Sequence, residues 1–256
     1  MPASHHGDLE GVLPTDLPAG PPTALLAHGA GSSAEFVLRA FGGALGGLGY
    51  RTVSWQQDGR GGAAAAEAAL DRLATALRPA LVGGVSLGAH AAAAWAARTG
   101  YAGRLLLVMP AWSGRPGRTG LAALAAADEI ARLGLPAALA RVRAAAHPWV
   151  AAELALAWPR YGAAGLVEAL RAAAVSRAPT PAELGRIAAP TALVALSGDP
   201  LHPAAVAAGW ARLIPAARLV TVPLGPADRA AGPDLGAAAA VALSGSRRSP
   251  DRAPGD

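Results

Sequence analysis

The sequence has 256 residues, enough for one sizeable domain with a large core, and contains no cysteine, which excludes disulfides and thiolate metal sites. Its net charge of +5 comes from arginines that are scattered singly rather than clustered with aromatic residues. We therefore expect solvated helix faces and no nucleic-acid partner.

We expect no targeting segment and no membrane-spanning segment in this sequence. Residues 1–22 are polar and proline-rich, without a positive start followed by an apolar core. The alanine-rich run 89–97 is interrupted by a histidine and a tryptophan and is too short for a membrane span. We expect a cytoplasmic protein that does not bind membranes, with an N-terminal segment at 1–22 and a disordered tail at 244–256.

Strand-like and helix-like runs alternate along much of the chain, which is typical of a parallel sheet with helices on both faces. Apolar runs predict strands at 23–27, 50–55, 80–83, 104–109, 191–196 and 218–222. Helical periodicity predicts helices at 35–48, 63–77, 203–214 and 234–243, with a further alanine-rich helix after residue 88. The sequence therefore predicts an α/β fold.

The segment between residues 110 and 189 is too long to be a plain connection. Proline residues divide it into helical stretches near 121–133, 136–146, 149–158 and 165–176. We expect these stretches to form additional helices.

The pattern Gly-x-Ser-x-Gly occurs at residues 84–88, between a short apolar strand and the alanine-rich helix. On such a sharp strand-to-helix turn, a serine is held in a strained conformation that exposes its hydroxyl at the top of the sheet. A side chain at Gly84 or Gly88 would collide with the neighbouring strand or helix. We therefore predict that Ser86 occupies a nucleophile position, the alternative being a tight turn without chemistry.

Two further landmarks lie at the ends of other predicted strands. The first is His28-Gly29-Ala30-Gly31, where small residues would let a substrate approach backbone N–H groups. The second is Asp199, in a Gly-Asp pair after the strand at 191–196. A carboxylate there could hold an imidazole in one tautomer and stabilise its charged form. The alternative is a turn aspartate before Pro200.

With these three landmarks in this order, the chain resembles the α/β-hydrolase fold family over about residues 20–243. The resemblance implies a mostly parallel sheet with helices on both faces and a helical cap. The core would comprise 23–110 and 190–243, and the cap would be an insertion at 111–189.

The resemblance also implies roles for individual residues. The backbone N–H groups of Ala30 and Leu87 would stabilise an oxyanion, His28 would have a structural role in its loop, and Asp199 would be the acid. Aromatic and imidazole side chains of the cap segment are candidates for the walls of a substrate pocket, each with packing as its alternative: Trp112, His147, Trp149 and Trp158.

The base is not where the family has it, because no histidine occurs from residue 203 to 256. His202 lies three residues after Asp199, and Asp228 lies in the loop where the family's histidine is expected. Since triads are defined by geometry and role rather than chain order, we hypothesise that His202 is the base and that Asp228 or Asp199 orients it. The alternative is that His202 caps the following helix. We expect His90 to pack in the interior.

The implied activity is acyl transfer to water without a cofactor or a metal ion. Ser86 would attack the carbonyl of a small-molecule ester or thioester, and water would hydrolyse the acyl-enzyme. The missing histidine supports an alternative, a catalytically impaired protein that binds a small apolar ligand. A third possibility, an accessory or interaction protein, requires an exposed apolar patch.

Overall fold

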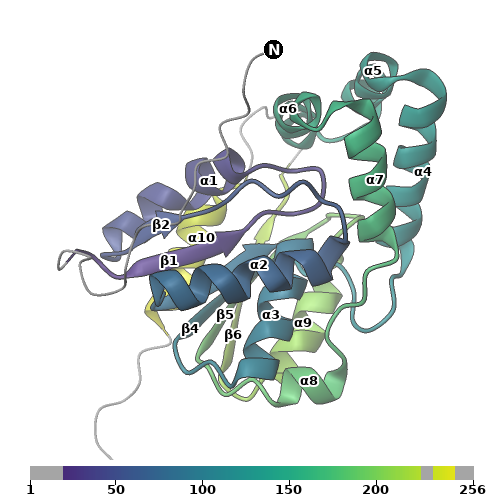
Figure 1. Cartoon of the computed structure of the whole chain (residues 1–256). Helices are drawn as coiled ribbons and strands as arrows, with labels where there is room; N and C mark the ends of the chain where they lie inside the picture. The colour runs from purple at the N-terminus through teal and green to yellow at the C-terminus, as the bar shows by residue number, and fades with distance from the viewer. Residues whose placement is uncertain (1–19, 226–232, 246–256) are drawn as a thin grey trace, which may run out of the picture.

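A six-stranded sheet is the centre of the structure, a computed structural model that describes residues 20–225 and 233–245 (Figure 1). Its strands lie in the order β2-β1-β3-β4-β5-β6, and all neighbours are parallel. Their bounds are β1 Thr23–Ala27, β2 Arg51–Val53, β3 Leu81–Val85, β4 Arg104–Val108, β5 Thr191–Ser197 and β6 Ala217–Pro223. Since parallel neighbours need crossover connections, the chain must return after each strand to the end of the sheet at which the strands begin.

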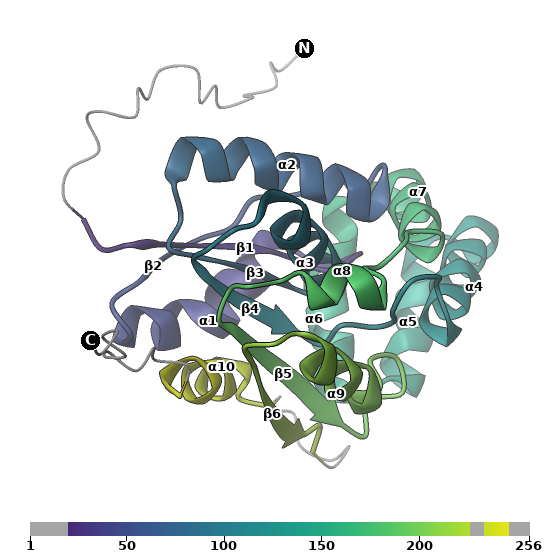
Figure 2. The same ribbon diagram turned by 90° about the horizontal axis from the view of Figure 1, so that it is seen from below.

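Helices fill these connections on both faces of the sheet (Figure 2). One face packs against α1 (Ala34–Gly47) and α10 (Leu235–Ser244); the other packs against α2 (Gly62–Leu77), α3 (Leu87–Thr99), α8 (Pro181–Gly185) and α9 (Ala204–Leu213). Side chains alternate between the two faces along each strand, so Leu106 of β4 packs towards α1 and Leu107 towards α3. The predicted fold class is confirmed.

Four helices form a layer of their own beyond one end of the sheet: α4 (Arg118–Leu133), α5 (Leu135–Ala145), α6 (Pro148–Ala157) and α7 (Gly162–Ala174) (Figure 1). A 3-10 turn at Trp158–Arg160 joins the last two. They share an apolar cluster that includes Ile130, Leu139 and Leu166. The ends of the predicted cap pack elsewhere, since Trp112 and Ile187 belong to the cluster beneath α3 and α9. The layer therefore occupies only the middle of the segment 111–189.

The predicted element boundaries agree with the observed ones to within three residues, the helix expected at 121 beginning at Arg118. The sequence analysis missed α8, which is too short for helical periodicity to be read. A local signal was present, because Thr180 and Glu183 form a capping box at its start.

The predicted terminal segments fall mostly outside the described residues, which begin at residue 20 and end at residue 245. Within the described ranges, no helix combines the length and apolar character that spanning a bilayer requires.

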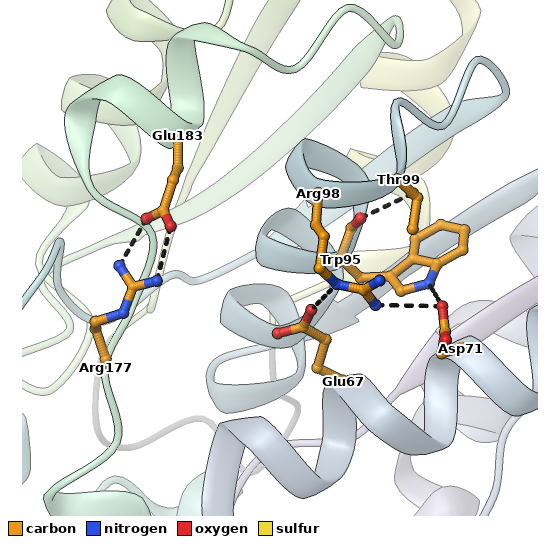
Figure 3. Close-up of polar contacts among 7 residues, drawn as sticks. All are labelled: Glu67, Asp71, Trp95, Arg98, Thr99, Arg177 and Glu183. Atoms are coloured by element: carbon orange, nitrogen blue, oxygen red, sulfur yellow. Dashed lines mark hydrogen bonds and ion pairs between the residues drawn. The ribbon is translucent and has the colours of Figure 1, made fainter.

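Polar contacts tie α2 to α3 along their exposed edge (Figure 3). Arg98 donates hydrogen bonds to Glu67 (2.8 Å) and Asp71 (3.2 Å), and the indole N–H of Trp95 donates to Asp71 (2.8 Å). The hydrogen bond from Trp95, followed by that from Arg98, lowers the pKa of Asp71. Because Arg98 is half exposed, these ion pairs contribute little to the stability of the fold.

A second ion pair fixes the start of α8 (Figure 3). The guanidinium of Arg177 donates to both carboxylate oxygens of Glu183, each at 2.7 Å. The same carboxylate accepts the N–H (2.7 Å) and the hydroxyl (2.9 Å) of Thr180. Arg177 above all, with Thr180, lowers the pKa of Glu183 to about 2, against the opposing effect of burial.

We expect Glu183→Gln to destabilise the protein in a pH-dependent way. The folded-state pKa of about 2 lies below the unfolded value, so the ionised group stabilises the fold above about pH 4.3, and this contribution is lost as pH falls towards 2. Urea unfolding should show that the substitution lowers the free energy of unfolding by up to about 1 kcal/mol at pH 7, and by less at pH 3.

Glu168→Gln is the matched control, because Glu168 forms a single contact with Arg60 and both side chains are more than half exposed. It should change the free energy of unfolding less than Glu183→Gln does at pH 7. A pH-independent loss in Glu183→Gln would contradict the assigned ion pair.

Candidate active site

Ser86 occupies the turn between β3 and α3 in a backbone conformation that non-glycine residues rarely adopt, with φ 53° and ψ −114°. Such a conformation costs about 1–3 kcal/mol and persists only where the surroundings enforce it. Here the N–H of Ser86 donates to the carbonyl of Val108 on β4 (2.9 Å), and its carbonyl accepts the N–H of His90 in α3 (3.1 Å). The turn is therefore anchored on both sides.

Glycines allow the strand and the helix to approach closely around this turn. A Cβ atom at Gly84 would lie 2.5 Å from the carbonyl carbon of Gly88, and one at Gly88 would lie 2.3 Å from the carbonyl oxygen of Ala27. Both separations are far shorter than van der Waals contact, so the predicted need for glycine at these positions is confirmed.

Asp199 and His202 lie on the loop after β5, and their side chains form a chain of hydrogen bonds that ends at Ser86. Nδ1 of His202 is 2.8 Å from Oδ2 of Asp199, and Nε2 is 2.9 Å from Oγ of Ser86. An ionised carboxylate can only accept, so Nδ1 carries the proton and Nε2 accepts the hydroxyl of Ser86. The histidine side chain is 18% exposed and the aspartate 11%, which limits competition from water.

The loop holds Asp199 in the ionised form. Burial acts to raise the pKa of Asp199, but the hydrogen bond and charge of His202 and the N–H groups of Leu201 (2.8 Å) and His202 (3.1 Å) together lower it. The hydroxyl of Thr119, at the start of α4, donates to the carbonyl of Leu201. The loop is therefore fixed both internally and by the helical layer.

The predicted oxyanion donors lie at two neighbouring chain segments. A Cβ atom at Gly29 would be 3.2 Å from Cβ of Ser86, so the loop that contains Ala30 passes directly beside the serine. Leu87 is the first residue of α3, where backbone N–H groups have no acceptor within the helix. Among the described residues, neither the N–H of Ala30 nor that of Leu87 has a hydrogen-bond acceptor.

Both ring nitrogens of His28 are engaged within its own loop region. Nδ1 is 2.8 Å from the carbonyl oxygen of Gly29, and Nε2 accepts the N–H of Gln57 (3.0 Å). Burial lowers the pKa of His28, partly opposed by the hydrogen bond to Gly29. These contacts connect the segment after β1 to the segment after β2.

Trp112 does not line the cavity beside Ser86, although the sequence analysis made it a candidate for substrate binding. The chain turns beneath the sheet after β4, and the Trp112 ring packs edge-on against His90 with centroids 4.6 Å apart. Nε2 of His90 accepts the N–H of Ala111 (3.0 Å), and burial, with the nearby His202, lowers the pKa of His90 to about 3. His90 therefore packs as a neutral side chain in the interior, as predicted.

A cavity of about 140 Å³ adjoins Ser86, His202 and Ala30. Among the cap candidates, Trp149 lines it, whereas His147 caps α6 and Trp158 is buried behind Gly31. Sequence reasoning missed other walls of this cavity, including Phe36, Met109, Leu154 and Leu201. The positive φ of Met109 (50°), directly after β4, is a structural signal that sequence patterns do not carry.

Asp228, the other candidate to orient His202, lies outside the described residues. Within the described ranges, no group of three or more His, Cys, Asp or Glu side chains is arranged to hold a metal ion.

Several solved structures are similar to this chain, although no protein-family model and no curated protein sequence matches it significantly. MenH from S. aureus matches with a TM-score of 0.66 and 16% identity, over 88% of this chain and 92% of that one. An esterase from Exiguobacterium antarcticum matches with a TM-score of 0.65 and 14% identity, over 79% of this chain and 83% of the esterase. The enol-lactonase from Burkholderia xenovorans LB400 matches with a TM-score of 0.63 and 18% identity, over 79% of this chain and 83% of the lactonase.

Together with the parallel sheet and its flanking helices, these matches identify the architecture. The chain has the α/β-hydrolase fold, as its resemblance to that family implied.

We expect Gly88→Ala to destabilise the protein by about 3 kcal/mol or more, because the added Cβ atom meets backbone rather than a side chain that can move. Gly43→Ala is the matched control, since nothing lies within 4 Å of its added Cβ atom and Gly43 is in the middle of α1. It should stabilise the protein by about 0.5–1 kcal/mol. Equal effects in urea unfolding would contradict the close approach at Gly88.

Proposed function

We propose that this protein is a serine hydrolase that cleaves an ester or thioester of a small molecule through an acyl-enzyme. The observation that carries the proposal is the continuous hydrogen-bond chain from Asp199 through His202 to Oγ of Ser86, at 2.8 Å and 2.9 Å. The names of two similar proteins, an enol-lactonase and an esterase, agree with this reaction class.

In the proposed acylation step, Oγ of Ser86 attacks the carbonyl carbon while its proton passes to Nε2 of His202. The negative charge that develops on the carbonyl oxygen is stabilised by the N–H groups of Ala30 and Leu87. The imidazolium then donates its proton to the leaving oxygen or sulfur as that bond to the carbonyl carbon breaks. An acyl group remains on Ser86.

Water completes the reaction by the same path. Nε2 of His202 takes a proton from the water as its oxygen attacks the acyl carbon, and this proton returns to Oγ of Ser86 as the acid leaves. Asp199 stabilises the imidazolium in both steps and keeps Nε2 directed at the serine. The lowered pKa of Asp199 keeps its carboxylate ionised throughout the neutral range.

The missing histidine after the last strand favoured a ligand-binding protein without catalysis as the alternative. The position of His202 weighs against this alternative, because its Nε2 is within hydrogen-bond reach of the serine. An interaction protein is also less well supported. Within residues 20–225 and 233–245, the large apolar side chains that are exposed are spread over different elements, among them Leu38 on α1, Leu121 on α4 and Val241 on α10.

Single substitutions test the assigned roles with an activated ester such as p-nitrophenyl acetate. Ser86→Ala and His202→Ala should each lower kcat/KM by on the order of 10⁴-fold, and Asp199→Asn by on the order of 10³-fold or more. A fluorophosphonate probe should label the wild-type protein at Ser86 and fail to label Ser86→Ala.

Asp228→Asn is the matched control for the acid, since Asp228 is the other residue considered for this role. We expect it to leave kcat/KM close to the wild-type value. A large loss in Asp228→Asn with a small loss in Asp199→Asn would transfer the role to Asp228. An unchanged rate in His202→Ala would overturn the proposed base.

A further inference from the structure

The cavity beside Ser86 is small and is lined in part by an aromatic contact. Its volume of about 140 Å³ is close to that of an engineered protein cavity, about 150 Å³, that binds benzene. Phe36 of α1 and Trp149 of α6 line it together, with ring centroids 6.2 Å apart and planes inclined at 52°. The space next to the serine therefore fits a short apolar group.

A second cavity, of about 250 Å³, lies on the other side of this contact, between α1, α6 and the start of α10. Three residues line both cavities: Phe36, Trp149 and Glu153. The two spaces thus share one wall, formed by side chains from one helix of the core and one of the helical layer.

An ion pair completes the shared wall, because Arg39 of α1 contacts Glu153 of α6. The guanidinium is 48% exposed and the carboxylate 25%, so this pair contributes little to stability in water. Phe36 is only 7% exposed and is packed in the core, whereas Trp149 is only partly buried. The indole of Trp149 is therefore the part of the wall that can be removed with the least effect on the core.

We propose that Trp149 determines substrate length by closing the cavity beside Ser86 against the second cavity. The substrates would then be esters that place a short apolar arm, no larger than a benzene ring, in the cavity beside the serine. Removing the indole would join the two spaces and admit a longer arm. This inference rests on the proposed hydrolase function and adds the size class of the substrate and a specificity-determining residue.

The test compares two ester series, because either arm of the ester can enter the cavity. One series varies the acid (p-nitrophenyl acetate, butyrate and octanoate), and the other varies the alcohol (methyl, butyl and octyl acetate). Wild type should lose kcat/KM steeply with length in at least one series. In that series, Trp149→Ala should raise kcat/KM for the ester with the eight-carbon arm, relative to the ester with the four-carbon arm, at least about tenfold. One methylene in a tight pocket changes rates by about 10–200-fold.

Leu156→Ala is the matched control, because Leu156 is on the same helix, is 59% exposed and lines neither cavity. It should keep the wild-type length profile. Phe36→Leu, which retains apolar bulk in α1, should shift the profile in the same direction as Trp149→Ala. Identical profiles for Trp149→Ala and Leu156→Ala in both series would overturn the inference.

A binding measurement separates this inference from the proposed reaction. In a Ser86→Ala background, calorimetric titration with two pairs of esters, butyl and octyl acetate and methyl butyrate and methyl octanoate, reports the length preference for each arm without turnover. Suppose that the wild-type protein hydrolyses no ester, but that adding Trp149→Ala to Ser86→Ala still strengthens binding of the longer ester of a pair relative to the shorter one at least about tenfold. Only the proposed reaction then fails. If the binding ratios of both pairs are unchanged while the wild-type protein is active, only the shared wall is wrong.

Discussion

The close approach of α3 to β1 and β3 is the constraint on which the rest of the molecule depends. Gly88 lies so near the carbonyl oxygen of Ala27 that any side chain there would displace the helix. This approach forces Ser86 into its positive-φ conformation and sets its hydroxyl at the edge of the sheet where β1, β3 and β5 all end. The loops after these strands, which contain Ala30 and Asp199, reach the serine because parallel strands deliver their ends to one edge.

The β5 loop contains both the proposed acid and the proposed base, whereas the resemblance to the α/β-hydrolase family implied a base on another loop. The three-residue separation lets Oδ1 of Asp199 accept the backbone N–H of His202, while Oδ2 faces the imidazole of the same residue. The carboxylate thereby shapes the loop and orients the ring at once. This double use explains how the site is complete, as proposed, without any histidine after β6.

The sequence predicted the strands, the long helices and the turn at Ser86, because these depend on local patterns of apolar residues, glycine and proline. It offered His202 as a hypothetical base, but the contact between His202 and Asp199 depends on side-chain torsions that no pattern encodes. Trp112 was misplaced for a related reason, since a residue after β4 can turn to either side of the sheet. Phe36 and Met109 gave no signal, because a wall depends on packing across distant elements.

The location of the proposed acid and base on one loop determines when in synthesis the proposed site is complete. Every residue proposed to contact the reacting atoms has been synthesised once residue 202 has been added, before α9, β6 and α10 are made. Those last elements supply burial, through side chains such as Trp210 and Leu243, and no reacting group. The proposed triad and the elements that close the core last are thus encoded in consecutive stretches of the chain, so a break in the chain after residue 202 would not divide the proposed triad.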